Sequence, residues 1–126
     1  MACGSPIRLS SSLVLLASAL LASTIGLPMT ISAETGIASV NAYSGELTAN
    51  GETPTPDSLT AAHRTLPFGT LVRVTNDVTG DWVMVRINDR GSFIAGRIID
   101  LTPAGAQAIG SDGLAHVSLD IVGWSG

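Results

Sequence analysis

The sequence contains very little cysteine: Cys3 is its one cysteine among 126 residues. Cys3 precedes an apolar stretch at residues 9–31, on the wrong side of it for a lipidation motif. A chain processed behind that stretch contains no cysteine, so disulfide bonds cannot stabilise it. The two histidines, His63 and His116, lack the spacing of metal ligands. We therefore expect a domain that folds on its own hydrophobic core, without a metal or a cofactor.

Positive charge is also scarce. Lysine is absent, and all ten acidic residues follow Ala33. Five arginines lie in the same part of the chain, which gives residues 34–126 a formal charge of −5. Nucleic acids and anionic lipids favour proteins with clustered positive charge. The charge balance therefore argues against both as partners.

The N-terminal segment is typical of a secretory signal peptide. Arg8 is its one charge, residues 9–31 are apolar or small, and Ser32-Ala33 provides a plausible cleavage site. The stretch also exceeds the roughly 20 residues that span a bilayer, so an uncleaved anchor is the alternative. We expect a signal peptide at residues 1–33 and one small domain at residues 34–126. We expect the mature chain in the periplasm, monomeric and without stable membrane insertion.

The remaining sequence indicates a mainly β domain. Period-two alternation and β-branched residues predict strands at residues 37–43, 71–75, 82–87 and 117–122. A small-residue strand precedes His63, and another strand leads to Asp100. The expected core comprises Val72, Val74, Val83, Val85 and Ile87. Several short strands with many glycines favour a compact β-barrel.

Two connections have local signals. Residues 76–81 form a predicted hairpin turn in which Gly80 takes a positive φ. A short helix is predicted from Thr102 as N-cap, with Pro103 as the first helical residue and Gly110 just beyond the end.

Polar residues follow the strand at residues 82–87 directly, as Asn88-Asp89-Arg90-Gly91. Carboxylates at the mouths of loops on rigid strands are typical of sugar chemistry. From the residues alone, Asp89 is equally well a turn former. By the same reasoning His63 is more often a hydrogen-bonded structural residue, and Glu52 an exposed loop carboxylate. Arg90 and Arg97 are possible ion-pair partners for Asp89 and the more structural Asp100.

Five motifs together resemble the rare lipoprotein A-type septal-ring lytic transglycosylases, over residues 36–122. They are Thr48-Ala-Asn-Gly-Glu52, Leu59-Thr-Ala-Ala-His63, Leu66-Pro-Phe-Gly-Thr70, Val85-Arg-Ile-Asn-Asp-Arg-Gly91 and Gly96-Arg-Ile-Ile-Asp-Leu101. The resemblance implies a six-stranded double-psi β-barrel with one or two short helices, related to the barrel of expansins. It also implies peptidoglycan glycan strands as the substrate.

The same resemblance implies which residues act. In that family the residues at the positions of Glu52, His63 and Asp89 line the cleft, and we expect these three to be catalytic. Tyr43, Asn88 and Arg90 are the expected substrate-binding residues. The aromatic-aromatic-Gly motif of the family is replaced here by Val40-Asn-Ala42, and Tyr43 is the residue that compensates.

A lytic transglycosylase needs one carboxyl group, whereas hydrolysis usually needs two. The acid protonates the glycosidic oxygen, and its conjugate base takes the proton of the C6 hydroxyl, which closes on C1 as a 1,6-anhydro end. Asp89 has the strongest motif for this role, with His63 assisting and Glu52 orienting. The main alternative is a non-catalytic, expansin-like module that binds and loosens glycan. A protein-interaction module would not require the three polar residues together.

Overall fold

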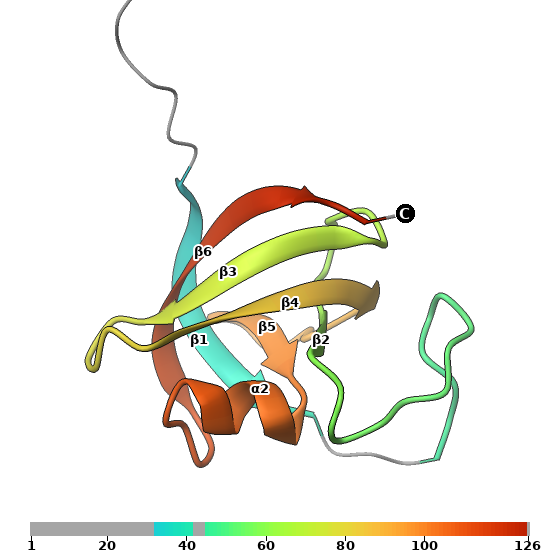
Figure 1. Ribbon diagram of the computed structural model, residues 1–126, viewed down its shortest axis with the longest axis horizontal. Helices are drawn as coiled ribbons and strands as arrows, with labels where there is room; N and C mark the ends of the chain where they lie inside the picture. The colour runs from blue at the N-terminus through green and yellow to red at the C-terminus, as the bar shows by residue number, and fades with distance from the viewer. Residues whose placement is uncertain (1–31, 42–44, 126) are drawn as a thin grey trace, which may run out of the picture. The chain divides into compact units, whose positions relative to one another are not determined.

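The computed structural model describes residues 32–41 and 45–125. Six strands form one closed barrel in the order β1-β5-β2-β4-β3-β6, and one short helix packs beside it (Figure 1). The elements are β1 (Ser32–Val40), β2 (Thr60–Ala62), β3 (Thr70–Asn76), β4 (Trp82–Asp89), β5 (Arg97–Leu101), α2 (Pro103–Ala108) and β6 (Ala115–Trp124). Two of the strand pairs, β1 with β5 and β2 with β4, are parallel. This architecture confirms the expected double-psi β-barrel.

The interior of the barrel is entirely aliphatic. Alternation along β3 and β4 buries Val72, Val74, Val83, Val85 and Ile87, each at most 6% exposed, as predicted. From the other elements the core adds Ile99, Leu101, Ile109, Val117 and Leu119. Burying such a side chain is worth about 1.5–3 kcal/mol. The core therefore stabilises a rigid frame for the polar residues at its strand ends.

Helix α2 follows β5 as the sequence predicts. The hydroxyl of Thr102 caps the helix by accepting from the N–H of Gly105 at 3.1 Å, and Pro103 is the first helical residue. The helix ends at Ile109, and Gly110 follows with φ 71°. Thr102 also donates to the carbonyl oxygen of Ser58 at 2.6 Å, so this cap fixes the chain that enters β2.

The strand boundaries differ from the predictions where pairing is non-local. β1 begins at Ser32, five residues earlier than expected, because it pairs antiparallel with β6 over this length. β4 continues to Asp89, because β2 pairs with it in parallel and aligns Ala62 with Asp89. Asp89 is therefore held in a strand and not in a free turn. Among residues 32–41 and 45–125, no helix has the length and apolar character to cross a membrane.

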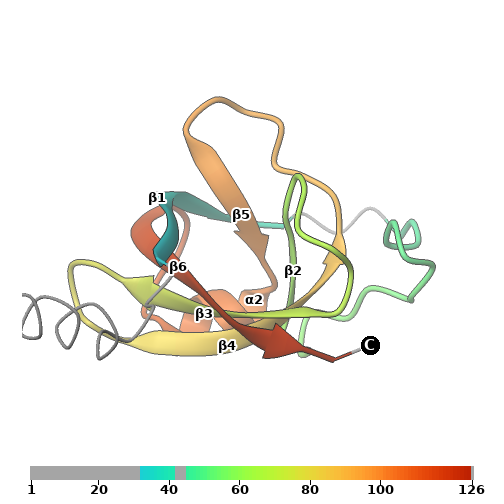
Figure 2. The same cartoon turned by 90° about the horizontal axis from the view of Figure 1, so that it is seen from above.

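Two loops project from the end of the barrel where β4 terminates. Figure 2 shows the loop between β4 and β5 standing away from the strands, and the segment between β1 and β2 extending to one side. The second loop returns to the barrel through the N–H of Asn50, which donates to the carbonyl oxygen of Asn88 at 3.2 Å. These loops surround the polar end of β4.

Candidate active site

A narrow polar hollow lies at the ends of β2, β4 and β5, against the loop that precedes β2. Its lining includes two carboxylates, Asp89 from β4 and Asp100 from β5. Ala62 of β2 lies between them, aligned with Asp89 on one side and with Asp100 on the other. The hollow has room for about one water-sized group. A hydroxyl group therefore fits here, whereas a sugar ring does not.

Asp89 is held from one side only. Its Oδ1 accepts hydrogen bonds from the backbone N–H of Ala49 at 2.9 Å and of Arg90 at 2.8 Å. No partner for Oδ2 is found within the described ranges. The carboxyl group is therefore oriented by rigid backbone donors and keeps one oxygen available to a ligand.

The motif Thr48-Ala-Asn-Gly-Glu52 forms the turn that supplies one of these donors. The N–H of Thr48 donates to the carbonyl of Glu52 at 2.9 Å, and the N–H of Glu52 donates to the side-chain hydroxyl of Thr48 at 3.1 Å. Gly51 takes φ 90° at the tip, a conformation that favours glycine. The turn points the N–H of Ala49 at Asp89, which explains why these residue types occur together.

Glu52 faces Arg86 and not the hollow. The two carboxylate oxygens accept from the guanidinium at 2.8 and 3.0 Å, and the side chain of Asn50 donates at 2.9 Å. The hydrogen bonds from Arg86, then those from Asn50, lower the pKa of Glu52 to about 2. Glu52 is therefore ionised at neutral pH and has no proton to give. The ion pair with Arg86 neutralises this charge and fixes the 48–52 turn to β4.

His63 is buried, and both of its ring nitrogens are occupied. Nδ1 accepts from the backbone N–H groups of Thr65 and Leu66, each at 3.1 Å. Nε2 therefore carries the proton and donates it to Glu34 at 2.5 Å. The backbone N–H of His63 donates to the carbonyl oxygen of Asp89 at 3.1 Å. The ring thus fixes a loop, while its backbone fixes the end of β4.

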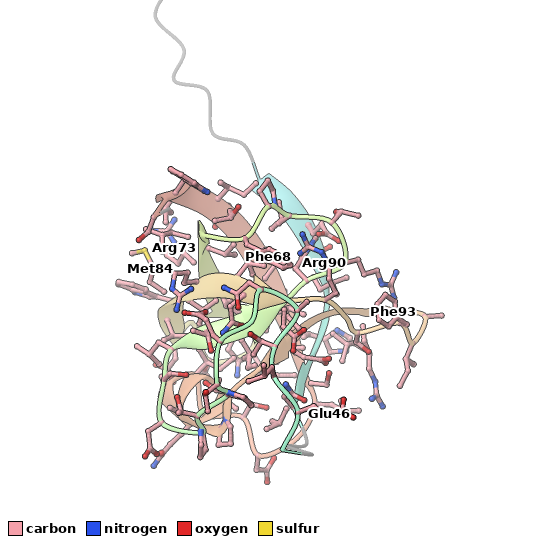
Figure 3. All side chains as sticks on the ribbon, turned by 90° about the vertical axis from the view of Figure 1, so that its right-hand side faces the viewer. Glu46, Phe68, Arg73, Met84, Arg90 and Phe93 are labelled. Atoms are coloured by element: carbon pink, nitrogen blue, oxygen red, sulfur yellow. The ribbon has the colours of Figure 1, made fainter. Side chains whose placement is uncertain are left out.

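Arg90 and Asn88 also turn toward the protein. The guanidinium of Arg90 donates to the carbonyls of His63 and Leu66 and lies 4.0 Å from the ring centre of Phe68, which it stacks over (Figure 3). Asn88 is buried, and its side chain helps to lower the pKa of Glu52. Tyr43, the other predicted binding residue, lies outside the described residues.

The proposed arginine–aspartate pairs are wrong. Among the described residues the arginine ion pairs are Arg73–Asp120 and Arg86–Glu52. Arg90 contacts Asp89 through its backbone N–H, because its guanidinium is used by loop carbonyls. The positions of these residues in the sequence did not indicate that loop carbonyls compete with Asp89 for the guanidinium of Arg90.

A clamp that the sequence analysis missed fixes the loop between β4 and β5. Arg64 donates to the carbonyls of Ser92 at 2.6 Å, Ile94 at 2.7 Å and Arg97 at 3.1 Å. Phe93 lies on this loop, 78% exposed, and points away from the barrel in Figure 3. An exposed aromatic ring on a fixed loop beside a polar hollow suits stacking on a sugar face. The position of Phe93 two residues after the Asn-Asp-Arg-Gly motif is the sequence signal that could have identified it.

Comparison with known proteins shows the family to which the chain belongs. Residues 34–119 match the family described as lytic transglycolase, and the chain belongs to this family. It is 58% identical over 82 residues to the probable endolytic peptidoglycan transglycosylase RlpA of Synechocystis sp., covering 64% of this chain and 26% of that protein. The RlpA proteins of Vibrio cholerae and Campylobacter jejuni are 48% and 45% identical, over 64% and 65% of this chain and 31% and 30% of theirs.

The chain spans about a quarter to a third of the length of these relatives. Among solved structures, the Streptomyces papain inhibitor has a similar fold, with a TM-score of 0.57 and 18% sequence identity. The match covers 75% of this chain and 99% of the inhibitor. At this identity the likeness concerns the barrel alone and carries nothing about inhibition.

Proposed function

We propose that the protein is an endolytic peptidoglycan transglycosylase that cleaves glycan strands and leaves 1,6-anhydro ends. The observation that carries the proposal is Asp89, whose carboxyl group is oriented by two backbone donors at an open hollow. The names of the RlpA relatives support the reaction, since they share the domain that contains this site. They favour cutting over the alternative of a module that only binds glycan.

In the proposed reaction Asp89 is the general acid. Its protonated carboxyl group donates to the glycosidic oxygen as the bond from that oxygen to C1 breaks. The carboxylate so formed takes the proton of the C6 hydroxyl of the same sugar, whose oxygen closes on C1, so no water is consumed. Oδ1 remains held by Ala49 and Arg90, which leaves Oδ2 to meet the substrate.

Glu52 and His63 act as positioning residues in this proposal. Glu52 is ionised and paired with Arg86, so it fixes the 48–52 turn against β4 and cannot replace Asp89 as the acid. His63 holds the end of β4 through its backbone and the 63–66 loop through its ring. Neither role requires either side chain to transfer a proton.

We further propose that Phe93 binds sugar by stacking. Its ring is exposed, and Gly91 brings the loop close to Asp100: a Cβ built on Gly91 would lie 3.4 Å from Asp100 Oδ2 and 3.9 Å from the Phe93 ring. The ring and the hollow are thus adjacent. Tyr43 remains a second candidate for the same task, and Asn88 and Arg90 contribute by shaping the site.

Residues 1–33 are proposed to be a cleaved signal peptide and residues 34–126 a monomeric periplasmic domain. Mass measurement of the intact protein from an exported fraction tests the boundary. A product that begins at Glu34 supports it, whereas retention of residues 1–33 indicates a membrane anchor.

The test of the activity uses purified sacculi. The protein is expected to release soluble fragments with 1,6-anhydro ends, identified by mass. Fragments with reducing ends would mean that water attacks C1 and that the reaction is hydrolysis. Binding of glycan without release of fragments would favour the loosening module.

A further inference from the structure

The second carboxylate of the hollow has a position that the proposed single-acid reaction does not use. Asp100 is aligned with Ala62, and Ala62 is aligned with Asp89, so the two aspartates lie two strands apart. Two strand spacings place their Cα atoms about 10 Å apart. Ile99 and Leu101, which flank Asp100, are in the core, so Asp100 faces outward into the hollow.

Asp100 has no cation beside it. Its Oδ1 accepts from the hydroxyl of Ser39, the residue aligned with it on β1. In the described part of the chain no arginine or histidine pairs with Asp100, in contrast to Glu52 and Asp120. Apart from Asp89, the side chains lining the hollow are uncharged. A half-buried carboxylate with one hydroxyl partner remains able to accept another hydroxyl proton.

The glycine opposite Asp100 keeps this carboxylate accessible. Gly91 takes φ 133°, and a Cβ there would lie 3.4 Å from Asp100 Oδ2. Ala62 adds only a methyl group between the two aspartates. The space between the carboxylates therefore admits a hydroxyl-sized group that contacts both sides.

We propose that Asp100 is a second catalytic residue, the base that takes the proton of the C6 hydroxyl while Asp89 acts as the acid. This inference rests on the proposed transglycosylase function. The Asp89 proton moves to the glycosidic oxygen, and the C1–O bond breaks toward that oxygen. The C6 oxygen forms the new bond to C1, and its proton moves to Asp100. One proton then returns from Asp100 to Asp89 through solvent, so nothing is consumed.

The test compares Asp100→Asn with wild type in the release of anhydro-ended fragments from sacculi. Asparagine still accepts from Ser39 but cannot take a proton at neutral pH. We expect the rate to fall about 10²- to 10⁴-fold, with glycan binding unchanged within about threefold. Asp112→Asn makes the same chemical change at an exposed carboxylate, and we expect it to cut like wild type.

The pH profile distinguishes a base from a structural residue. Wild type is expected to show a bell-shaped profile, in which the acidic limb reports the base and the alkaline limb reports the acid. Asp100→Asn should lose the acidic limb, and Asp89→Asn the alkaline one. Ser39→Ala removes the donor to Asp100, so the acidic limb should move to higher pH while the fold is kept.

The outcomes separate the two proposals. If wild type cuts and Asp100→Asn cuts within twofold of it, or keeps the acidic limb, the inference about Asp100 is wrong while the activity stands. If Asp100→Asn does not fold, Ser39→Ala takes its place in the test. An acidic limb at the same pH as in wild type would then show that the inference about Asp100 is wrong. If wild type releases no anhydro-ended fragment, the proposed function fails and the role of Asp100 fails with it.

Discussion

Two acidic regions lie close together at one end of the barrel, and they are built in opposite ways. Glu52 accepts hydrogen bonds from the two terminal guanidinium nitrogens of Arg86, and these bonds hold the pKa of Glu52 near 2. Among the described residues, Asp89 and Asp100 have backbone N–H groups and a serine hydroxyl as their partners. Full pairing with a cation fixes a charge permanently. Partial satisfaction by neutral donors orients a carboxyl group and leaves an oxygen for chemistry.

The largest expected effect on activity comes from a substitution in the region of Asp89 and Asp100, the carboxylates without a cation partner. Asp89→Asn preserves the shape and the bonds to Oδ1 but removes the acidic proton. The release of anhydro-ended fragments should fall about 10²- to 10⁴-fold, whereas the thermal midpoint should change little. Glu52→Gln, the matched change in the paired region, should lower the rate much less. Equal losses in the two variants would contradict the distinction between the regions.

An intermediate effect is expected for His63, which supports the end of β4. His63→Ala leaves the N–H groups of Thr65 and Leu66 without their acceptor and removes the partner of Glu34. The free energy of unfolding should fall by about 1–3 kcal/mol. The rate of cutting should fall less than the roughly 10²-fold expected for a proton-transferring residue. A larger loss with an altered pH profile would mean that the ring itself transfers a proton.

A smaller effect is expected for substitution of Phe93. This substitution tests whether the substrate binds beside Asp89 and Asp100. Phe93→Ala should weaken glycan binding about three- to tenfold by removing an exposed stacking surface. Val78→Ala is the control, because Val78 is 83% exposed on the distant β3–β4 turn. Sedimentation with sacculi measures both variants. Identical binding by Phe93→Ala and wild type would place the glycan elsewhere.

The smallest effect concerns the paired region and appears in stability. A lowered pKa in the folded state means that the Glu52–Arg86 pair stabilises the fold above pH 4.5, the ordinary pKa of a glutamate, and that this contribution is lost as the pH falls toward 2. The pair is partly exposed, so Glu52→Gln should cost only about 0.2–1 kcal/mol near pH 7. Urea unfolding at several pH values should show this difference vanish near pH 2. A difference independent of pH would mean that packing, not charge, is responsible.

The sequence predicted those features of the fold that depend on residues close together in the chain. Alternation located Val72, Val74, Val83 and Val85 in the core, and the Thr102 cap was evident from residue types alone. Register across strands is not local. The alignment of Ala62 with both Asp89 and Asp100 depends on which strands the barrel brings together. For this reason the sequence suggested Asp100 only as a structural residue and did not suggest Glu34 as the partner of His63.

The competition for arginine was equally hidden in the sequence. Arg86 and Arg90 each lie within three residues of Asp89 in the chain, yet Arg86 binds Glu52 and Arg90 binds no carboxylate among the described residues. Arg64 and Arg90 bind backbone carbonyls of loops instead. These carbonyls lie more than 20 residues from Arg64 and Arg90 in the sequence, so the need for a long donor side chain becomes visible only once the loops are in place.

The pairing of β1 with β6 has a consequence for when the protein folds. Strand β1 obtains one of its two neighbours from β6, so the ring of strands stays open until β6 has been synthesised. Until then both β1 and β3 lack a partner along one edge. Contacts this far apart in sequence form slowly, because a long loop must close before any pairing is gained. An emerging chain therefore cannot close its barrel before β6 has left the ribosome.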